Sequence, residues 1–333
     1  NTMKQSFAGD VFNTAVYLKR TFTDVNVHLV TAVGKDQFSL DMIQYFQHEN
    51  IGSNFVFQSE TKIPGLYSIQ LDDQGERSFT YWRENSAARQ VMQHIDEEAI
   101  RQLSTGDMFF FSGISLAVLS PETRAEFWQL VDKLSAAGVQ IVFDPNYRPR
   151  LWNGPEEAKA EYAKAYAACD ILMPGVEDFK WLYDLESLDE ILAFCEPYNI
   201  NELVLKNGPE SVYCQVEGQL THVDITPVTY VVDTTSAGDS FNGIFLDNSL
   251  ISIISSLYLL ILASELHLFS TYLLEIRSSP TYLKNEISSY KTCSILFSFS
   301  ISPHKDAGIN KGINPKSSLV GKTISFSNIK TLQ

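Results

Sequence analysis

The chain has 333 residues, which is enough for one large α/β domain or for two ordinary domains. Its formal net charge of −15 argues against nucleic-acid binding, because phosphate backbones repel so acidic a protein. Hydrophobic residues make up 44% and charged residues 20% of the chain, an ordinary composition for a globular protein. The four cysteines form no CxxC pair and no apolar signal sequence opens the chain, so we expect a cytoplasmic protein whose cysteines pack in the core.

Short apolar runs alternate with helix-like segments from residue 1 to about residue 247. The runs typical of strands are residues 25–33, 107–112, 139–144, 171–173 and 202–206. Residues 38–49 and 121–137 have helical spacing, and Ser120 precedes Pro121 as a helix cap. Short apolar strands separated by helices predict a mostly parallel sheet with helices on both faces, which is a three-layer α/β fold.

One segment interrupts this alternation of strands and helices. Residues 63–71 and 76–83 each alternate apolar and polar side chains, and Asp-Asp-Gln-Gly lies between them. This pattern predicts a β-hairpin. The hairpin could cover a binding site as a lid or form an ordinary sheet edge, and the sequence favours neither.

The chain changes character at about residue 248. From there to residue 333 only four acidic residues occur, and glycine is absent from residues 244–307. Residues 248–264 are apolar but contain five serines, and they fall short of the roughly 20 mostly apolar residues of a membrane helix. We therefore expect an α/β domain over residues 1–247, an atypical C-terminal extension of unknown structure over residues 248–333, and no membrane partner.

The most informative stretch is Asp-Thr-Thr-Ser-Ala-Gly-Asp-Ser-Phe-Asn-Gly at residues 233–243, which follows an apolar run at residues 230–232. Small residues let the backbone bend tightly and approach a ligand. A helix that begins near Ala237 would direct N–H groups and a positive dipole end at an anion. Asp239 would then lie beside the anion as a general base for a hydroxyl group. Without further context, a plain helix cap is an equally good interpretation.

Two arginines are candidates for binding a carboxylate, because a planar guanidinium matches it bidentately. Arg83 ends the second arm of the hairpin, and Arg148 follows the buried strand at residues 139–144. Ligands of open α/β sheets bind at the carboxyl ends of the strands, so Arg148 is well placed. The alternative is that both arginines form structural or surface ion pairs, as most arginines do.

These stretches together resemble the pfkB (ribokinase-like) family of carbohydrate kinases. Residues 233–243 resemble its motif with the core D-T-x-[AG]-[AG]-G-D, and residues 8–15 resemble its motif G-G-x-x-x-N, with Ala8 at the first Gly position. The resemblance implies that Asp239 is the catalytic base. It implies an anion hole formed by Ser236, Ala237 and Gly238. It also implies sugar contacts from Gly9, Asp10 and Asn13.

Four further stretches are similar to the 2-keto-3-deoxygluconate kinases of this family: Pro-Gly-Leu-Tyr at 64–67, Tyr-Trp-Arg at 81–83, Ser-Gly-Ile-Ser-Leu-Ala at 112–117 and Asn-Tyr-Arg-Pro-Arg-Leu-Trp at 146–152. This similarity implies contacts with a sugar acid from Tyr67, Tyr81, Arg83 and Arg148. Residues 206–211 resemble the nucleotide loop K-x-G-x-x-G/S, although in isolation they indicate a surface turn. The implied nucleotide-binding residues are Asn146, Lys206, Gly208, Glu210 and Ser211.

Three departures from the family pattern stand out. The first strand, which should precede Phe7, is missing from these residues, and the adenine-pocket segment G-A-x-x-P is not recognisable after residue 247. The N-x-x-E stretch, which is linked to magnesium in many members, is here Gly-Val-Glu-Asp at residues 175–178. It keeps acids but loses the Asn, so the metal ligands stay undetermined.

The resemblance implies a ribokinase-like three-layer α/β sandwich with a mostly parallel sheet and a small β-hairpin lid at about residues 63–83. It implies transfer of the γ-phosphate of ATP, with Mg²⁺, to the terminal hydroxyl of 2-keto-3-deoxygluconate. It also implies a homodimer or larger homo-oligomer that pairs through the lid. The alternatives are a kinase for a neutral sugar such as fructose or ribose, and a non-catalytic sugar-binding protein suggested by the two aberrant ends.

Overall fold

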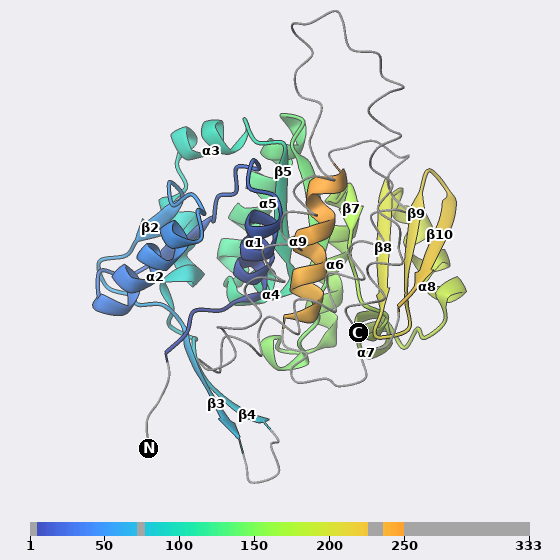
Figure 1. Cartoon of the computed structure of the whole chain (residues 1–333), viewed down its shortest axis with the longest axis horizontal. Helices are drawn as coiled ribbons and strands as arrows, with labels where there is room; N and C mark the ends of the chain where they lie inside the picture. The colour runs from blue at the N-terminus through green and yellow to red at the C-terminus, as the bar shows by residue number, and fades with distance from the viewer. Residues whose placement is uncertain (1–4, 72–76, 226–235, 250–333) are drawn as a thin grey trace, which may run out of the picture. The chain divides into compact units, whose positions relative to one another are not determined.

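The computed structural model describes residues 5–71, 77–225 and 236–249 (Figure 1). Every described residue lies within Asn1–Arg277, the first of the two units into which the chain divides. Three predicted features lie outside the described residues, namely the hairpin turn, the strand at residues 230–232 and the extension from residue 250 onward.

A six-stranded sheet forms the centre of the described domain. Its strands are β5 (Met108–Ser112), β6 (Gln140–Asp144), β7 (Ile171–Leu172), β8 (Glu202–Asn207), β9 (Ser211–Val216) and β10 (Gln219–Asp224). Their order in the sheet is β10-β9-β8-β7-β6-β5. The four strands β5 to β8 are parallel, and β9 and β10 add an antiparallel end. The prediction of a mostly parallel sheet is therefore confirmed.

Helices cover both faces of this sheet. Alternate residues of a strand point to opposite faces, and here both sets are apolar and pack against helices. Ile141 and Phe143 of β6 pack in a core shared with helices α5 to α8, whereas Val142 packs with α9 on the other face. Full burial of side chains of this size stabilises the fold by roughly 1.5–3 kcal/mol each. The helices are α5 (Pro121–Ala136), α6 (Pro155–Ala168), α7 (Val176–Tyr183), α8 (Leu188–Cys195) and α9 (Ala237–Ser249).

Helix α1 (Asp10–Thr21) lies against α9, and Figure 1 shows the two side by side in front of the sheet. Gly243 permits this approach. A Cβ atom at Gly243 would lie 2.4 Å from the carbonyl oxygen of Thr14 and 2.8 Å from the backbone nitrogen of Leu18. The close packing fixes the first turns of α1 and α9 against each other, although they are far apart in the sequence.

The N-terminal part of the domain forms a second, two-stranded parallel sheet. Strands β1 (Thr31–Val33) and β2 (Val56–Gln58) are joined through helix α2 (Gln37–His48), whose N-cap Asp36 accepts a hydrogen bond from the backbone of Ser39. The predicted strand at residues 25–33 is too long. Its first part pairs irregularly with a turn at residues 52–55, so only an isolated bridge between His28 and Gly52 precedes β1.

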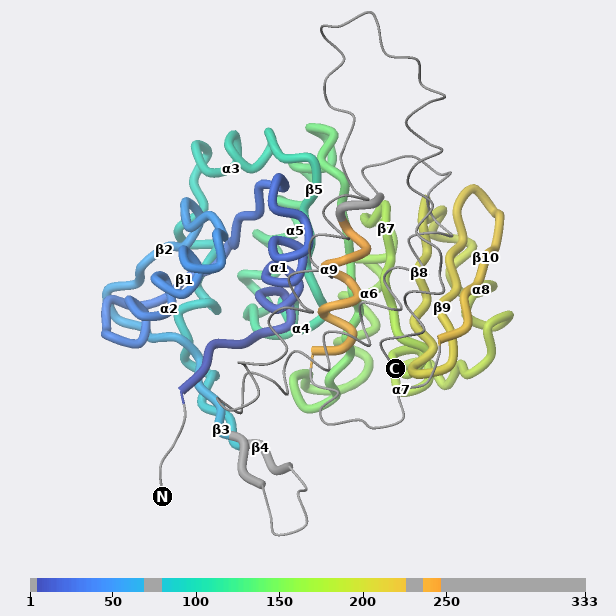
Figure 2. The backbone as a smooth tube through the Cα atoms, in the orientation of Figure 1, coloured from blue at the N-terminus to red at the C-terminus, as the bar shows by residue number. Residues whose placement is uncertain are grey.

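The predicted hairpin is confirmed as strands β3 (Leu66–Leu71) and β4 (Arg77–Trp82), which are antiparallel with Tyr67 opposite Tyr81. They form a sheet of their own, and Figure 2 traces them running side by side. The first strand begins three residues later than predicted, because Pro64 has no N–H to donate to a ladder.

The remaining helices are short connections: α3 (Glu97–Leu103), α4 (Gly113–Val118) and the 3₁₀ segments η1 (Ala87–His94), η2 (Pro149–Leu151) and η3 (Glu196–Tyr198). Cys169, Cys195 and Cys214 are free and buried, which confirms core packing for these three. In the described part of the chain, no helix combines the length and apolar character needed to cross a membrane.

Candidate active site

Helix α9 begins at Ala237, as the residue pattern predicted. The residue before it, Ser236, has a φ of 66°, in the left-handed region that residues with side chains rarely adopt. The backbone N–H of Ser240 donates to the Ser236 carbonyl at 2.9 Å and closes the first turn. The positive end of the helix dipole therefore lies at the three predicted anion-hole residues, Ser236, Ala237 and Gly238.

Asp239 lies in the first turn of α9 and is held by α1. Asn13 Nδ2 donates at 2.9 Å to Asp239 Oδ2 and at 2.9 Å to Ser236 Oγ. Burial raises the pKa of Asp239 to about 7, and the negative charges of Asp10 and Asp144 add to this effect. The Asn13 hydrogen bond and the positive charge of Lys206 act in the opposite direction. A carboxylate with a pKa near 7 is well suited to take a proton at neutral pH.

Asp10 forms the second carboxylate of the site. It follows Gly9, the N-cap of α1, and its Oδ2 accepts hydrogen bonds from Ser112 Oγ and, at 3.1 Å, from Asn146 Nδ2. Burial raises the pKa of Asp10. Asn146, predicted to bind the nucleotide, therefore contacts a residue predicted to bind the sugar.

Lys206 brings a positive charge to the start of α9. Its Nζ donates at 3.0 Å to Asn242 Oδ1 and lies 3.4 Å from Asp144 Oδ2, which also accepts from Asn242 Nδ2 at 2.7 Å. A Cβ atom at Gly238 would lie 3.9 Å from this ammonium group. The structure thus brings a predicted nucleotide residue next to a predicted anion-hole residue.

The other residues of the predicted nucleotide loop form the turn between β8 and β9. Gly208 has a φ of 53°, which favours glycine. Glu210 and Ser211 accept hydrogen bonds from Asn207 Nδ2 at 3.2 Å and 3.4 Å. These contacts shape the turn, and a nucleotide contact by the three predicted residues remains a prediction.

The hairpin contributes an aromatic pair and an arginine. The ring centroids of Tyr67 and Tyr81 are 6.1 Å apart, and the Arg83 guanidinium lies 4.4 Å from the centroid of the Tyr81 ring. Burial raises the pKa of Tyr67, with smaller contributions from Tyr81 and Asp239. Burial lowers the pKa of Arg83, and Tyr81 and Asp10 partly oppose this change. Tyr67 and Arg83 therefore lie close enough to the two carboxylates to interact with their charge.

Arg148 is exposed and precedes η2. Within the described residues, its guanidinium hydrogen-bonds only to the carbonyl of Tyr147, at 3.0 Å. Among the described residues no hydrogen bond or ion pair joins it to Arg83 or to Asp10, so the prediction that both arginines reach one pocket is not tested.

Sequence reasoning missed three polar residues of this network. Ser112 and Asp144 are the last residues of the parallel strands β5 and β6, and the rule that ligands bind at the carboxyl ends of strands could have found them. Asn242 follows Asp239 by three residues on the same helix, so helical spacing places both on one face.

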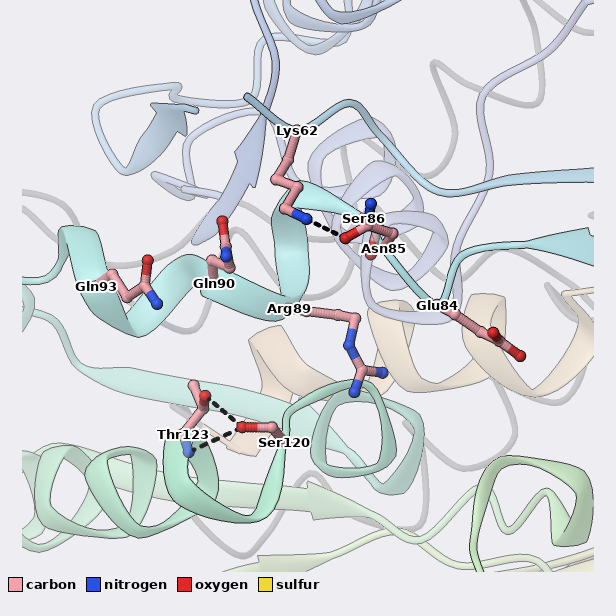
Figure 3. A pocket seen from close by; sticks show the side chains of 9 residues that line it. All are labelled: Lys62, Glu84, Asn85, Ser86, Arg89, Gln90, Gln93, Ser120 and Thr123. Carbon is pink, nitrogen blue, oxygen red and sulfur yellow. Dashed lines mark hydrogen bonds between the residues drawn. The ribbon is translucent and has the colours of Figure 1, made fainter. Parts of the chain in front are cut away.

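A separate pocket of about 170 Å³ lies between η1 and the start of α5 (Figure 3). Its wall carries charges of both signs, including Glu84 and Arg89. Lys62 donates to Asn85, and Ser120 caps α5. None of the predicted site residues lines this pocket, so it is not the candidate active site.

The chain is similar to known proteins in sequence and in fold. The chain is 40% identical over 256 residues to the 2-dehydro-3-deoxygluconokinase of Haemophilus influenzae, covering 74% of this chain and 81% of that protein. It is 37% identical over 250 residues to the enzyme of the same name from Dickeya dadantii, covering 73% and 81%. The crystal structure of 2-dehydro-3-deoxygluconokinase from Thermotoga maritima superposes with a TM-score of 0.68 at 22% identity, covering 80% of this chain and 85% of that one, and shows the shared fold.

The sequence profile of pfkB family carbohydrate kinases matches residues 1–250, which include both carboxylates and the whole of α9. The chain therefore belongs to the pfkB family of carbohydrate kinases.

Proposed function

We propose that this chain transfers the γ-phosphoryl group of ATP to the terminal hydroxyl of 2-dehydro-3-deoxygluconate, the sugar acid called 2-keto-3-deoxygluconate above. One observation carries the chemical part of the proposal. Asp239, with a pKa raised to about 7, lies at the positive end of α9, where Asn13 holds it and Lys206 supplies a cation. The relatives named above support the choice of sugar acid.

In this proposal each residue has a distinct task. Asp239 accepts the proton of the attacking hydroxyl, and Asn13 orients the receiving carboxylate. The backbone at residues 236–238 and the Lys206 ammonium stabilise the negative charge of the transferring phosphoryl group. Because these groups are held by α1, α9 and β8 before the substrate binds, little reorganisation is needed during the reaction.

Magnesium fits this site through a single carboxylate. The described residues contain no group of three or more His, Cys, Asp or Glu side chains that could hold a metal. Asp144 Oδ1 is buried and has no hydrogen-bond partner among the described residues, although Oδ2 is occupied. Mg²⁺ usually takes one or two carboxylates and fills its other positions with substrate phosphates and water, so Asp144 is the residue we assign to it. When bound, the ion would neutralise phosphate charge.

Recognition of the sugar carboxylate is assigned to Arg83 and Arg148. Arg83 interacts with the charge of Asp10 and stacks on Tyr81, so it can reach a sugar that touches Asp10. Arg148 is exposed, and binding of the acid would draw it toward the ligand. A neutral sugar would offer neither arginine a carboxylate to pair with.

Pairing of two chains through the hairpin is a further part of the proposal. Trp82 is 61% exposed and Leu66 is 42% exposed, and such apolar area on a two-stranded sheet favours contact with a second copy. Light scattering should give a dimer or larger assembly, and a monomer at assay concentration would contradict this part.

The test of function is a substrate panel. The full chain is assayed for ATP consumption with 2-dehydro-3-deoxygluconate, gluconate, fructose and ribose. We expect the highest kcat/KM for 2-dehydro-3-deoxygluconate. A higher value for fructose or ribose would support the neutral-sugar alternative, and sugar binding by calorimetry without ATP turnover would support the non-catalytic one.

A further inference from the structure

Asp178, in the first turn of α7, holds two backbone segments at once. Its Oδ1 accepts the backbone N–H of Tyr147 at 2.7 Å, and its Oδ2 accepts the backbone N–H of Gly175 at 2.8 Å. The side chain is buried, and burial together with the charge of Asp144 raises its pKa. A buried carboxylate is costly to retain, so both hydrogen bonds must offset that cost.

The first of these bonds fixes the turn after β6. Tyr147 lies between Asn146 and Arg148, two residues assigned to the site. Asn146 has a φ of 35°, a strained backbone position, and its side chain donates to Asp10. The hydrogen bond from the backbone N–H of the next residue, Tyr147, to Asp178 holds this conformation in place.

The second bond fixes the turn after β7, which is attached to Lys206. The Lys206 backbone N–H donates to the Pro174 carbonyl at 2.8 Å, and Gly175 pairs with Lys206 in an isolated parallel bridge. Asp178 therefore joins the turn that carries Asn146 and Arg148 to the strand that carries Lys206.

We propose that Asp178 is a positioning residue that sets the sugar-binding turn after β6 relative to the phosphate-binding Lys206. This assignment rests on the proposed function. It differs from the magnesium role that the family pattern associates with residues 175–178: each Asp178 oxygen accepts a backbone N–H, whereas Asp144 Oδ1 is buried without a hydrogen-bond partner among the described residues. The role requires an acid, since an amide at this position has one acceptor oxygen for two N–H donors.

The variant Asp178→Asn tests the proposal, with Asp189→Asn as the matched control. Asp189 is an exposed acid in the first turn of α8, outside the candidate site. In Asp178→Asn we expect the KM for 2-dehydro-3-deoxygluconate to rise by about tenfold to a hundredfold, as small misplacements of binding groups can cause. The Mg²⁺ concentration for half-maximal activity should stay unchanged. Asp189→Asn should match the parent in both quantities.

Hydrogen exchange provides a readout that does not depend on activity. In the parent chain, the amides of Tyr147 and Gly175 should exchange slowly, and Asp178→Asn should accelerate both while β5 and β6 stay protected. A raised Mg²⁺ requirement with unchanged sugar KM would overturn the proposal in favour of a metal role. Rapid exchange of the Tyr147 amide in the parent would overturn it even if the variant fails to fold. A parent chain without activity on the sugar acid would refute the proposed function. The exchange rates of the Tyr147 and Gly175 amides would still show whether Asp178 holds the two turns.

Discussion

The two sides of the candidate site are built in different ways. Asn13 and Asp239 are 226 residues apart in the sequence, yet their side chains bond at 2.9 Å because α1 and α9 pack around Gly243. On the other side, Tyr67 and Tyr81 belong to a two-stranded hairpin and are 43% and 44% exposed. The carboxylate side is thus rigid before the ligand arrives, whereas the hairpin side keeps surface available for it.

The difference follows from what each side has to do. A proton acceptor must be held close to its working position, because small errors in geometry cost large factors in rate. A recognition group must first let the sugar enter. The Arg83–Tyr81 contact suits that task, since an exposed cation–π pair contributes only about 0.5–1 kcal/mol and is easily rearranged.

The largest effect is expected from removing the base on the rigid side. Asp239→Asn should lower kcat by about 10²–10⁴-fold, because an amide cannot accept the hydroxyl proton. Sugar binding, measured by calorimetry, should persist, and the exposed control Asp189→Asn should behave like the parent. Turnover of Asp239→Asn within about threefold of the parent would show that Asp239 is not the base.

Arginine variants test the recognition side. Arg83→Ala and Arg148→Ala should each weaken binding of the sugar acid by roughly 1.5–3 kcal/mol, the contribution of a charge-assisted hydrogen bond. Binding of the corresponding neutral sugar alcohol should change little. Calorimetry with both ligands measures the difference, and exposed Arg150→Ala is the control. Equal losses for acid and alcohol would remove the carboxylate role.

Gly243→Ala tests the rigidity of the helix pair. The added methyl group would meet the Thr14 carbonyl and should destabilise the fold by about 1–3 kcal/mol, as overpacking does. Denaturant unfolding measures this loss. Gly106→Ala should cost less, since its Cβ would meet one carbonyl oxygen at 3.2 Å. Unchanged stability of Gly243→Ala would mean that α1 and α9 pack less tightly than the structure shows.

The smallest expected effect is a shift in pH dependence. Asp239 works as a base only when deprotonated, so kcat/KM should rise with pH through about 7, where burial places its pKa. Asn13 lowers that pKa by its hydrogen bond, and Asn13→Ala should therefore move the rise to higher pH. Exposed Asn201→Ala should leave the profile in place. A shift to lower pH in Asn13→Ala would contradict the assignment.

Local patterns predicted much of the fold correctly. Helix α5 begins after its Ser120 cap, α9 begins at Ala237, and β3 and β4 form the predicted hairpin. Caps, turn residues and alternation act over a few residues, so they can be recognised without knowing the rest of the chain. The strand at residues 25–33 was predicted too long. Its partner at residues 52–55 forms a turn, so only an isolated bridge between His28 and Gly52 precedes β1, and the sequence of residues 25–33 does not contain this information.

The resemblance of the sequence motifs to the pfkB family supplied the family, the candidate base and the candidate sugar contacts, because the chemistry of these residues by itself fits a plain helix cap equally well. Only tertiary structure decided which polar groups meet. Asp10 acquires Ser112 and Asn146 as partners, and Lys206 acquires Asp144 and Asn242, through the side-by-side alignment of strand ends with α1 and α9. The pKa of Asp239 depends on burial and on charges from α1, β6 and β8, and no pattern confined to residues 233–243 contains that information.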